Sequence, residues 1–171
     1  MRGELVPAVP PGTILDDVYI PMEVVHQGKR VIFQPKARVW DVPFLGAERE
    51  FARKVRTLSG NYQLVQLAPW LLSGNNPLRL EFISHKLLRL VVPFALAAIL
   101  AASIFLPGPI YRVALILQLL LYGLSLLAWL RPGRGLLARI ADAALTFVVL
   151  NSAAAVAFLR VVTRRKVAWI R

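Results

Sequence analysis

Long apolar runs dominate the second half of the chain. Three stretches carry no charged side chain, namely 90–111, 113–130 and 143–159. A helix rises about 1.5 Å per residue, so a run of this length reaches across a hydrocarbon core of about 30 Å. Prolines and glycines at 107–109 and 132–133 separate the runs. The pattern predicts a transmembrane region over 90–171 with two to three helices, at about 90–107, 111–130 and 137–160.

The first half alternates more finely between apolar and polar positions. Residues 18–27 follow a helical pattern that Gly28 is placed to end, and 30–33 is a short apolar run that predicts a strand. A loop, a helix, a glycine and a strand in this order are typical of an α/β domain. The unit is too small for a whole sheet. We therefore predict that 1–62 is the C-terminal remnant of a larger α/β domain.

A second helix is predicted over 48–59, with Gly60 and Asn61 ending it. Two stripes recur at helical spacing, one apolar and one basic: Phe51, Val55, Leu58 and Tyr62 form the first, and Arg49, Arg53 and Arg56 the second. A basic stripe is usually a solvated face or a contact with anionic lipid. It is also suited to clamping a phosphate, because guanidinium groups bind phosphate oxygens bidentately.

The segment 63–89 links the two halves. Residues 64–72 are apolar but too short to span a bilayer, and Trp70 and Pro69 suggest an element lying in the membrane interface. His85 follows at the mouth of the first predicted span. A lone histidine at this position is more often a structural or headgroup-level residue than a proton carrier.

Composition agrees with a membrane protein. Hydrophobic residues make up 57% of the chain and the formal net charge is +12, a combination that nucleic-acid-binding proteins rarely show. There is no cysteine, which excludes disulfides and thiolate metal sites. Only two histidines are present, so a histidine-rich metal centre is not expected.

The basic residues predict an orientation in an inner or plasma membrane. Lys86 and Arg89 precede the first span, and Arg131, Arg134 and Arg139 follow the second, which places 1–89 and 131–139 in the cytoplasm. The third run is harder to place, because crossing would carry the basic C-terminus outside. Either it is a re-entrant or interfacial helix, or it crosses against the charge bias.

Asp16 and Asp17 are the candidate catalytic residues of the first half. Adjacent carboxylates at the start of a helix accept backbone N–H bonds whatever the function. They also raise one another's pKa, which suits a general base. The residues alone leave both interpretations open.

Three stretches together resemble the C-terminal half of membrane-bound family 2 glycosyltransferases, the polysaccharide-synthase-like enzymes related to cellulose and hyaluronan synthases. Residues 14–21, Ile-Leu-Asp-Asp-Val-Tyr-Ile-Pro, continuing into 27–31, Gln-Gly-Lys-Arg-Val, look like the acceptor-site acidic motif and the helix and strand after it. Residues 53–57, Arg-Lys-Val-Arg-Thr, align with the QRxRW element, and 69–72 with 84–89 look like the interface segment before the C-terminal helices. The similarity covers nearly the whole chain.

The resemblance implies inverting transfer of a sugar from a nucleotide diphosphate donor to a polysaccharide or lipid-linked acceptor. Asp17 would be the general base and Asp16 its supporting residue. Arg56, with Arg53 and Lys54, would bind the diphosphate. The sequence departs from QRxRW at Arg53, Lys54 and Thr57, so processivity and acceptor type do not follow from it.

The family's divalent metal, Mg²⁺ or Mn²⁺, would be held by a DxD motif that this sequence lacks. We therefore expect a truncated or split enzyme that is catalytically silent alone, with a separate chain supplying the donor-binding half. The alternative is a non-enzymatic membrane adaptor whose basic helix binds anionic lipid or a partner. A transporter is disfavoured, because only Asp142 borders a span.

Overall fold

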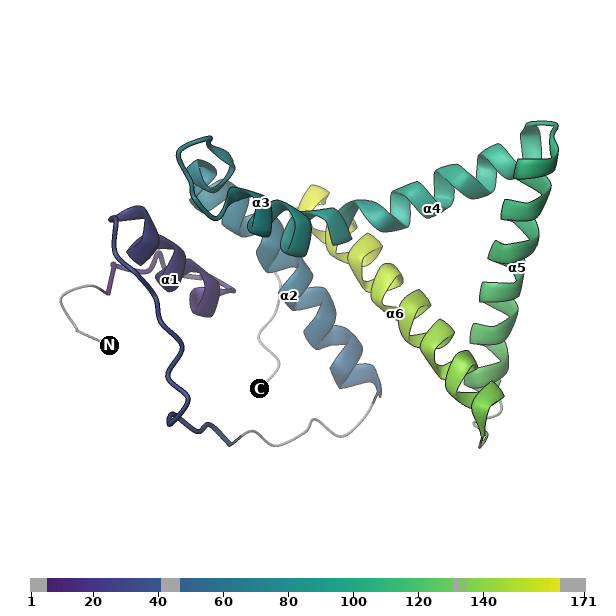
Figure 1. Cartoon of the computed structure of the whole chain (residues 1–171), viewed down its shortest axis with the longest axis horizontal. Helices are drawn as coiled ribbons and strands as arrows, with labels where there is room; N and C mark the ends of the chain where they lie inside the picture. Colours follow the sequence, from purple (N-terminus) through teal and green to yellow (C-terminus); the bar gives the residue numbers. More distant parts are fainter. Residues whose placement is uncertain (1–5, 41–46, 131–132, 134, 164–171) are drawn as a thin grey trace.

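The computed structural model describes residues 6–40, 47–130, 133 and 135–163. Helices are the only regular elements in these residues, and they trace an open arrangement in which three long apolar helices form a triangle beside the remaining helices (Figure 1). In order they are α1 (Asp16–His26), α2 (Ala47–Leu67), η2 (Pro69–Leu72), α3 (Arg79–Phe82), η3 (Ile83–Leu87), α4 (Leu88–Phe105), α5 (Pro109–Leu130) and α6 (Leu136–Val162).

The predicted α/β remnant is wrong. The structure is 75% helical, and the described residues contain no strand. The predicted helix 18–27 is present as α1, but residues 30–33 are unpaired chain, with Ile32 80% and Phe33 89% exposed. A strand exists only through its ladder of hydrogen bonds to a neighbour, and the described chain offers this segment none. A β-prone sequence is therefore not sufficient to form a strand at residues 30–33.

The three predicted apolar helices are confirmed. Arg79–Phe105, Pro109–Leu130 and Leu136–Val162 are each long and apolar enough to cross a membrane, and so this is a membrane protein. The helices follow the sides of a triangle, with α4 and α5 meeting at Gly108 (Figure 1). Gly108 has a φ of 140°, a conformation that residues with a side chain rarely adopt. The second predicted turn lies partly outside the described residues, and the basic tail 164–171 lies wholly outside them.

Small residues bring α5 and α6 together. Ser125 and Ala128 on α5 and Ala141 and Ala144 on α6 are all buried. Between membrane helices, small side chains allow the backbones to approach closely, and van der Waals contact then supplies much of the association energy. The rest of both helices is largely exposed apolar surface, as expected for groups that face lipid.

The basic helix α2 packs along α6 (Figure 1). A core cluster joins Val55 and Leu58 of α2 to Leu90 of α4 and to three alanines of α6, Ala153, Ala154 and Ala157. The predicted apolar stripe is therefore the packing face of the helix. The predicted end at Gly60 and Asn61 is wrong, since α2 continues to Leu67. Both residues are buried inside the helix, and packing overrides their preference for a helix end.

Candidate functional site

Asp16 and Asp17 open α1 and both are exposed. The expected N-cap role is not seen: Leu15 is the N-cap residue, and no side chain caps the helix. The Asp17 backbone N–H instead donates to Oδ1 of Asp16 at 3.0 Å. Asp16 is thereby oriented by its neighbour, while the Asp17 carboxylate stays in water at the positive end of the helix dipole.

The start of α1 is held against the middle of α2. The Ile14 N–H donates to Oε1 of Gln63 at 2.8 Å, and Gln63 Nε2 donates to the Gly12 carbonyl at 3.0 Å. Leu15 packs on Gly60 so closely that a Cβ at Gly60 would lie 2.6 Å from Leu15 Cγ. This contact explains a glycine inside a helix. It also fixes the backbone two residues before Asp17.

The far end of α1 is fixed as well. Trp70 of η2 donates from Nε1 to Oε1 of Glu23 at 3.1 Å, and its ring stacks on His26 with centroids 4.0 Å apart. A second core cluster around Leu64, Leu71 and Phe82 fills the space beneath. The helix bearing the two aspartates is therefore attached at both ends to the elements that precede α4.

The basic stripe of α2 is partly engaged in ion pairs. Arg53 makes a bidentate contact with Glu50, at 2.9 Å from Nε and 2.8 Å from Nη2, and Lys54 Nζ lies 3.3 Å from the same carboxylate. Hydrogen bonds, from Arg53 above all and also from Lys54, lower the pKa of Glu50 from 4.5 to about 2. Glu50 thus remains charged at neutral pH, and Arg56 lies half-buried three residues beyond Arg53.

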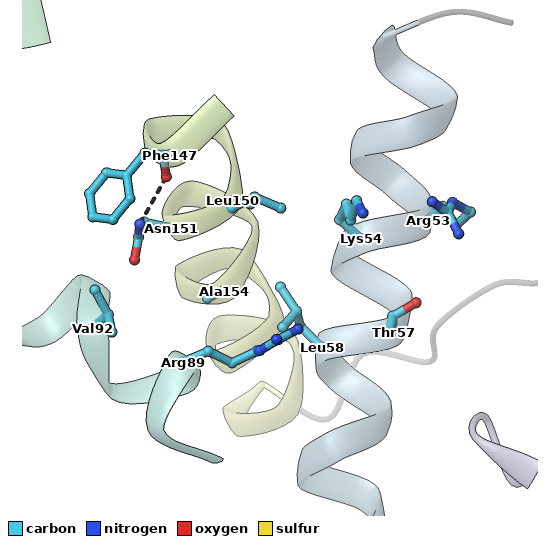
Figure 2. Close-up of a pocket in the computed structure, with 10 residues that line it drawn as sticks. All are labelled: Arg53, Lys54, Thr57, Leu58, Arg89, Val92, Phe147, Leu150, Asn151 and Ala154. Atoms are coloured by element: carbon cyan, nitrogen blue, oxygen red, sulfur yellow. Dashed lines mark hydrogen bonds between the residues drawn. The ribbon is translucent and has the colours of Figure 1, made fainter. Parts of the chain in front are cut away.

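A cavity of about 380 Å³ lies between α2, α4 and α6 (Figure 2). Its polar lining comprises Arg53, Lys54, Thr57, Arg89 and Asn151, and its apolar lining Leu58, Val92, Phe147, Leu150 and Ala154. In Figure 2 the Arg89 side chain extends from α4 toward α2, and Leu150 of α6 points toward the same gap. The cavity therefore combines cationic groups with an apolar wall.

The structure brings some predicted site residues together and leaves others apart. Arg53 and Lys54 line the cavity, but neither Asp17 nor Arg56 does. The structure connects Asp17 and Arg56 only indirectly, through Gly60. Gly60 packs against Leu15, two residues before Asp17, and it lies one helical turn after Arg56 in α2. The two site residues lie on different helices, with Asp17 exposed at the start of α1 and Arg56 half-buried within α2.

Sequence reasoning did not identify Arg89, Phe147 or Asn151 as lining residues of a site. One signal was available for Arg89, which is the last charge before a long apolar helix. None was available for Phe147, because only the packing of α2 on α6 places it at the cavity.

Metal ligation is not visible in the part of the chain that the structure describes. No group of three or more acidic or histidine side chains gathers there in a way that could hold an ion. The divalent metal implied by the resemblance thus stays a prediction for a segment other than the described residues.

Comparison with known proteins adds no family assignment. No protein-family model, curated protein or solved structure matches this chain. The resemblance to family 2 glycosyltransferases therefore rests on three stretches of the sequence alone, at 14–21, at 53–57, and at 69–72 with 84–89.

Proposed function

We propose that the chain is the membrane-embedded C-terminal portion of an inverting glycosyltransferase. It would transfer a sugar from a nucleotide-sugar donor to a polysaccharide or lipid-linked acceptor at the cytoplasmic face of an inner or plasma membrane. The observation that carries the proposal is the way the helix with the aspartate pair is held in place. Asp17 is exposed, and its helix is held at both ends beside a basic helix that packs on membrane helices.

Asp17 would act as the general base. An ionised carboxylate in water can accept the proton of an acceptor hydroxyl as that oxygen attacks the anomeric carbon of the donor. The C–O bond to the nucleoside diphosphate then breaks, and the leaving phosphate becomes more negative. Arg56, one helical turn from the Leu15–Gly60 contact, is suited to stabilise that charge.

The donor itself requires further protein. This sequence has no DxD motif, and we propose that another segment or chain supplies the donor site and its metal. Residues 31–40 support a partner on this side. Ile32, Phe33, Val39 and Trp40 are 80–91% exposed, an apolar surface that isolated water-facing chain seldom presents. A partner that buried these side chains would sit next to α1.

Native membranes provide the test, because they contain every segment that the reaction needs. Asp17→Asn is introduced at the natural locus, and membranes are incubated with a panel of labelled nucleotide sugars. We expect loss of a general base to lower incorporation by about 10²- to 10⁴-fold for one donor. Asp142→Asn is the matched control, since Asp142 is an exposed carboxylate on α6 far along the chain.

The adaptor hypothesis predicts a different result. An adaptor that acts through its basic helix needs no proton acceptor, so Asp17→Asn membranes would retain wild-type incorporation with every donor. That result would overturn the proposed function.

A further inference from the structure

The cavity between α2, α4 and α6 adjoins both a charged helix and two apolar helices. The first half of α2 carries six charged residues within 48–56, which hydrocarbon cannot solvate. The same helix packs along the apolar α6, and α4 begins beside both of them. We infer that this pair lies near the bilayer surface, because there the charged side of α2 meets water while the exposed apolar side chains of α6 meet lipid.

The cations of the cavity differ in their contacts. Lys54 and Arg53 both contact Glu50. Arg89 has no ion-pair partner among the residues that the structure describes, although it stands at the first turn of an apolar helix. A guanidinium in this position gains most from an anion that is itself held at the surface of the bilayer.

The other side of the cavity is suited to hydrocarbon. Val92 of α4 and Leu150 of α6 form part of a wall with no ionisable side chain, and Leu150 is 39% exposed. The volume of about 380 Å³ falls within the usual range of small-molecule sites. Free phosphate would use only the cationic end, whereas an amphiphile with an anionic head would use both.

We propose that this cavity binds an anionic phospholipid from the leaflet that contacts α2. Arg89 and Lys54 hold the lipid phosphate, and one acyl chain lies against Val92 and Leu150. The bound lipid joins α2 to α4 and α6 by neutralising charges that would otherwise repel one another across the gap. This site contains neither Asp17 nor Arg56, and it assigns to the lipid phosphate Lys54, which the resemblance implied for the donor diphosphate.

Native mass spectrometry of the full chain, purified in detergent and stripped of lipid, tests the proposal. Phosphatidylglycerol and phosphatidylcholine with the same acyl chains are added separately, and the bound fraction is measured against lipid concentration. We expect the wild-type chain to retain phosphatidylglycerol at least tenfold more tightly. Lys54→Gln combined with Arg89→Gln should abolish that preference, because each removes a charged contact to phosphate.

The matched control is Arg112→Gln combined with Arg139→Gln, which removes two exposed positive charges from outside the cavity. It should keep the wild-type preference. Equal loss in both double variants would mean diffuse surface attraction, and equal retention of the two lipids by the wild-type chain would mean no headgroup site. Either result would overturn the proposal.

Leu150→Trp distinguishes binding of a lipid from binding of free phosphate. It also tests the proposal if the double variant does not fold. The larger ring occupies the apolar side and leaves both cationic residues unchanged in the sequence, so it should weaken phosphatidylglycerol binding by about tenfold or more. Competition by millimolar inorganic phosphate should be weak. If phosphate displaces the lipid fully, or Leu150→Trp binds like the wild type, the acyl-chain assignment is wrong.

Discussion

A single glycine carries the contact on which the candidate site depends. Gly60 lies within α2, where glycine costs about 1 kcal/mol relative to alanine, and yet it is buried against Leu15. The cost is offset by the close approach of the two segments. Residue choice at this position therefore follows tertiary packing rather than helix propensity.

Gly60→Ala tests this interpretation. A methyl group would lie 2.6 Å from Leu15 Cγ, so the start of α1 must move away. We expect overpacking to destabilise the α1–α2 contact by about 1–3 kcal/mol, partly offset by better helix propensity. Limited proteolysis within 6–40 should then be faster. Gly123→Ala is the control, because a Cβ at Gly123 meets nothing within 4 Å, and it should leave the cleavage rate unchanged.

Glu50 sets how much positive charge α2 presents. Its pKa is lowered to about 2, so it is ionised at neutral pH and competes with any anion for Arg53 and Lys54. Because the folded pKa lies below the ordinary 4.5, the ion pairs stabilise the helix above about pH 4.5. Their contribution is lost as pH falls toward 2.

Two measurements check this behaviour. The Glu50 carboxyl resonance should titrate near pH 2 in the folded chain, whereas titration near 4.5 would show that the ion pairs do not persist in solution. Glu50→Gln should tighten phosphatidylglycerol binding, since it removes the competing carboxylate. Weaker binding in that variant would contradict the assigned role.

Among the elements, α6 has the least obvious place in the membrane. It is long and apolar enough to span, but α2 packs along it and brings charged side chains to its flank. If α6 crossed perpendicular to the bilayer plane, the charged side chains of α2 would lie in hydrocarbon, at a cost of several kcal/mol. We therefore expect α4 and α5 to cross as a hairpin while α6 lies along the surface with α2. The basic tail then stays on the cytoplasmic side.

Cysteine labelling distinguishes the two topologies without background, because the chain has no cysteine of its own. Single variants Arg112→Cys, Arg139→Cys and Thr163→Cys are treated with a membrane-impermeant maleimide in sealed vesicles. A surface-lying α6 predicts that positions 139 and 163 react from the same side and 112 from the other. If 163 instead reacts together with 112, α6 crosses the bilayer.

The contact between α5 and α6 predicts a further pair of variants. Ala144 is buried at 6% exposure, whereas Ala143 beside it is exposed. Ala144→Leu should force the helices apart and destabilise the fold by about 1–3 kcal/mol, and Ala143→Leu should leave stability nearly unchanged. Thermal unfolding in detergent measures the difference. Equal melting temperatures would show that the helices do not pack through these alanines.

The sequence was informative about helices and misleading about the strand for related reasons. Helical periodicity and apolar length are local properties, so α1 and the three membrane helices could be predicted from residues alone. Residues 30–33 have the composition of a strand, but pairing depends on a partner elsewhere. The extension of α2 past Gly60 and the cavity at Arg89 likewise depend on contacts between distant segments.

For the whole molecule, α2 connects the α1 region to the three apolar helices. The helix contacts α6 with its apolar stripe and supports α1 through Gln63 and Gly60. Asp17 is thereby attached, through α1 and α2, to α6. The predicted roles divide accordingly, with proton removal at Asp17, phosphate stabilisation at Arg56, and lipid binding at the separate cavity of Arg89.

The kinetics of sugar transfer in native membranes test the central claim most directly. With the responsive donor, Asp17→Asn should lower kcat by about 10²- to 10⁴-fold and leave the donor KM nearly unchanged, whereas Asp17→Glu should recover part of the rate. This is the expected signature of a lost proton acceptor. A wild-type kcat in Asp17→Asn membranes, or an effect on KM alone, would contradict the account.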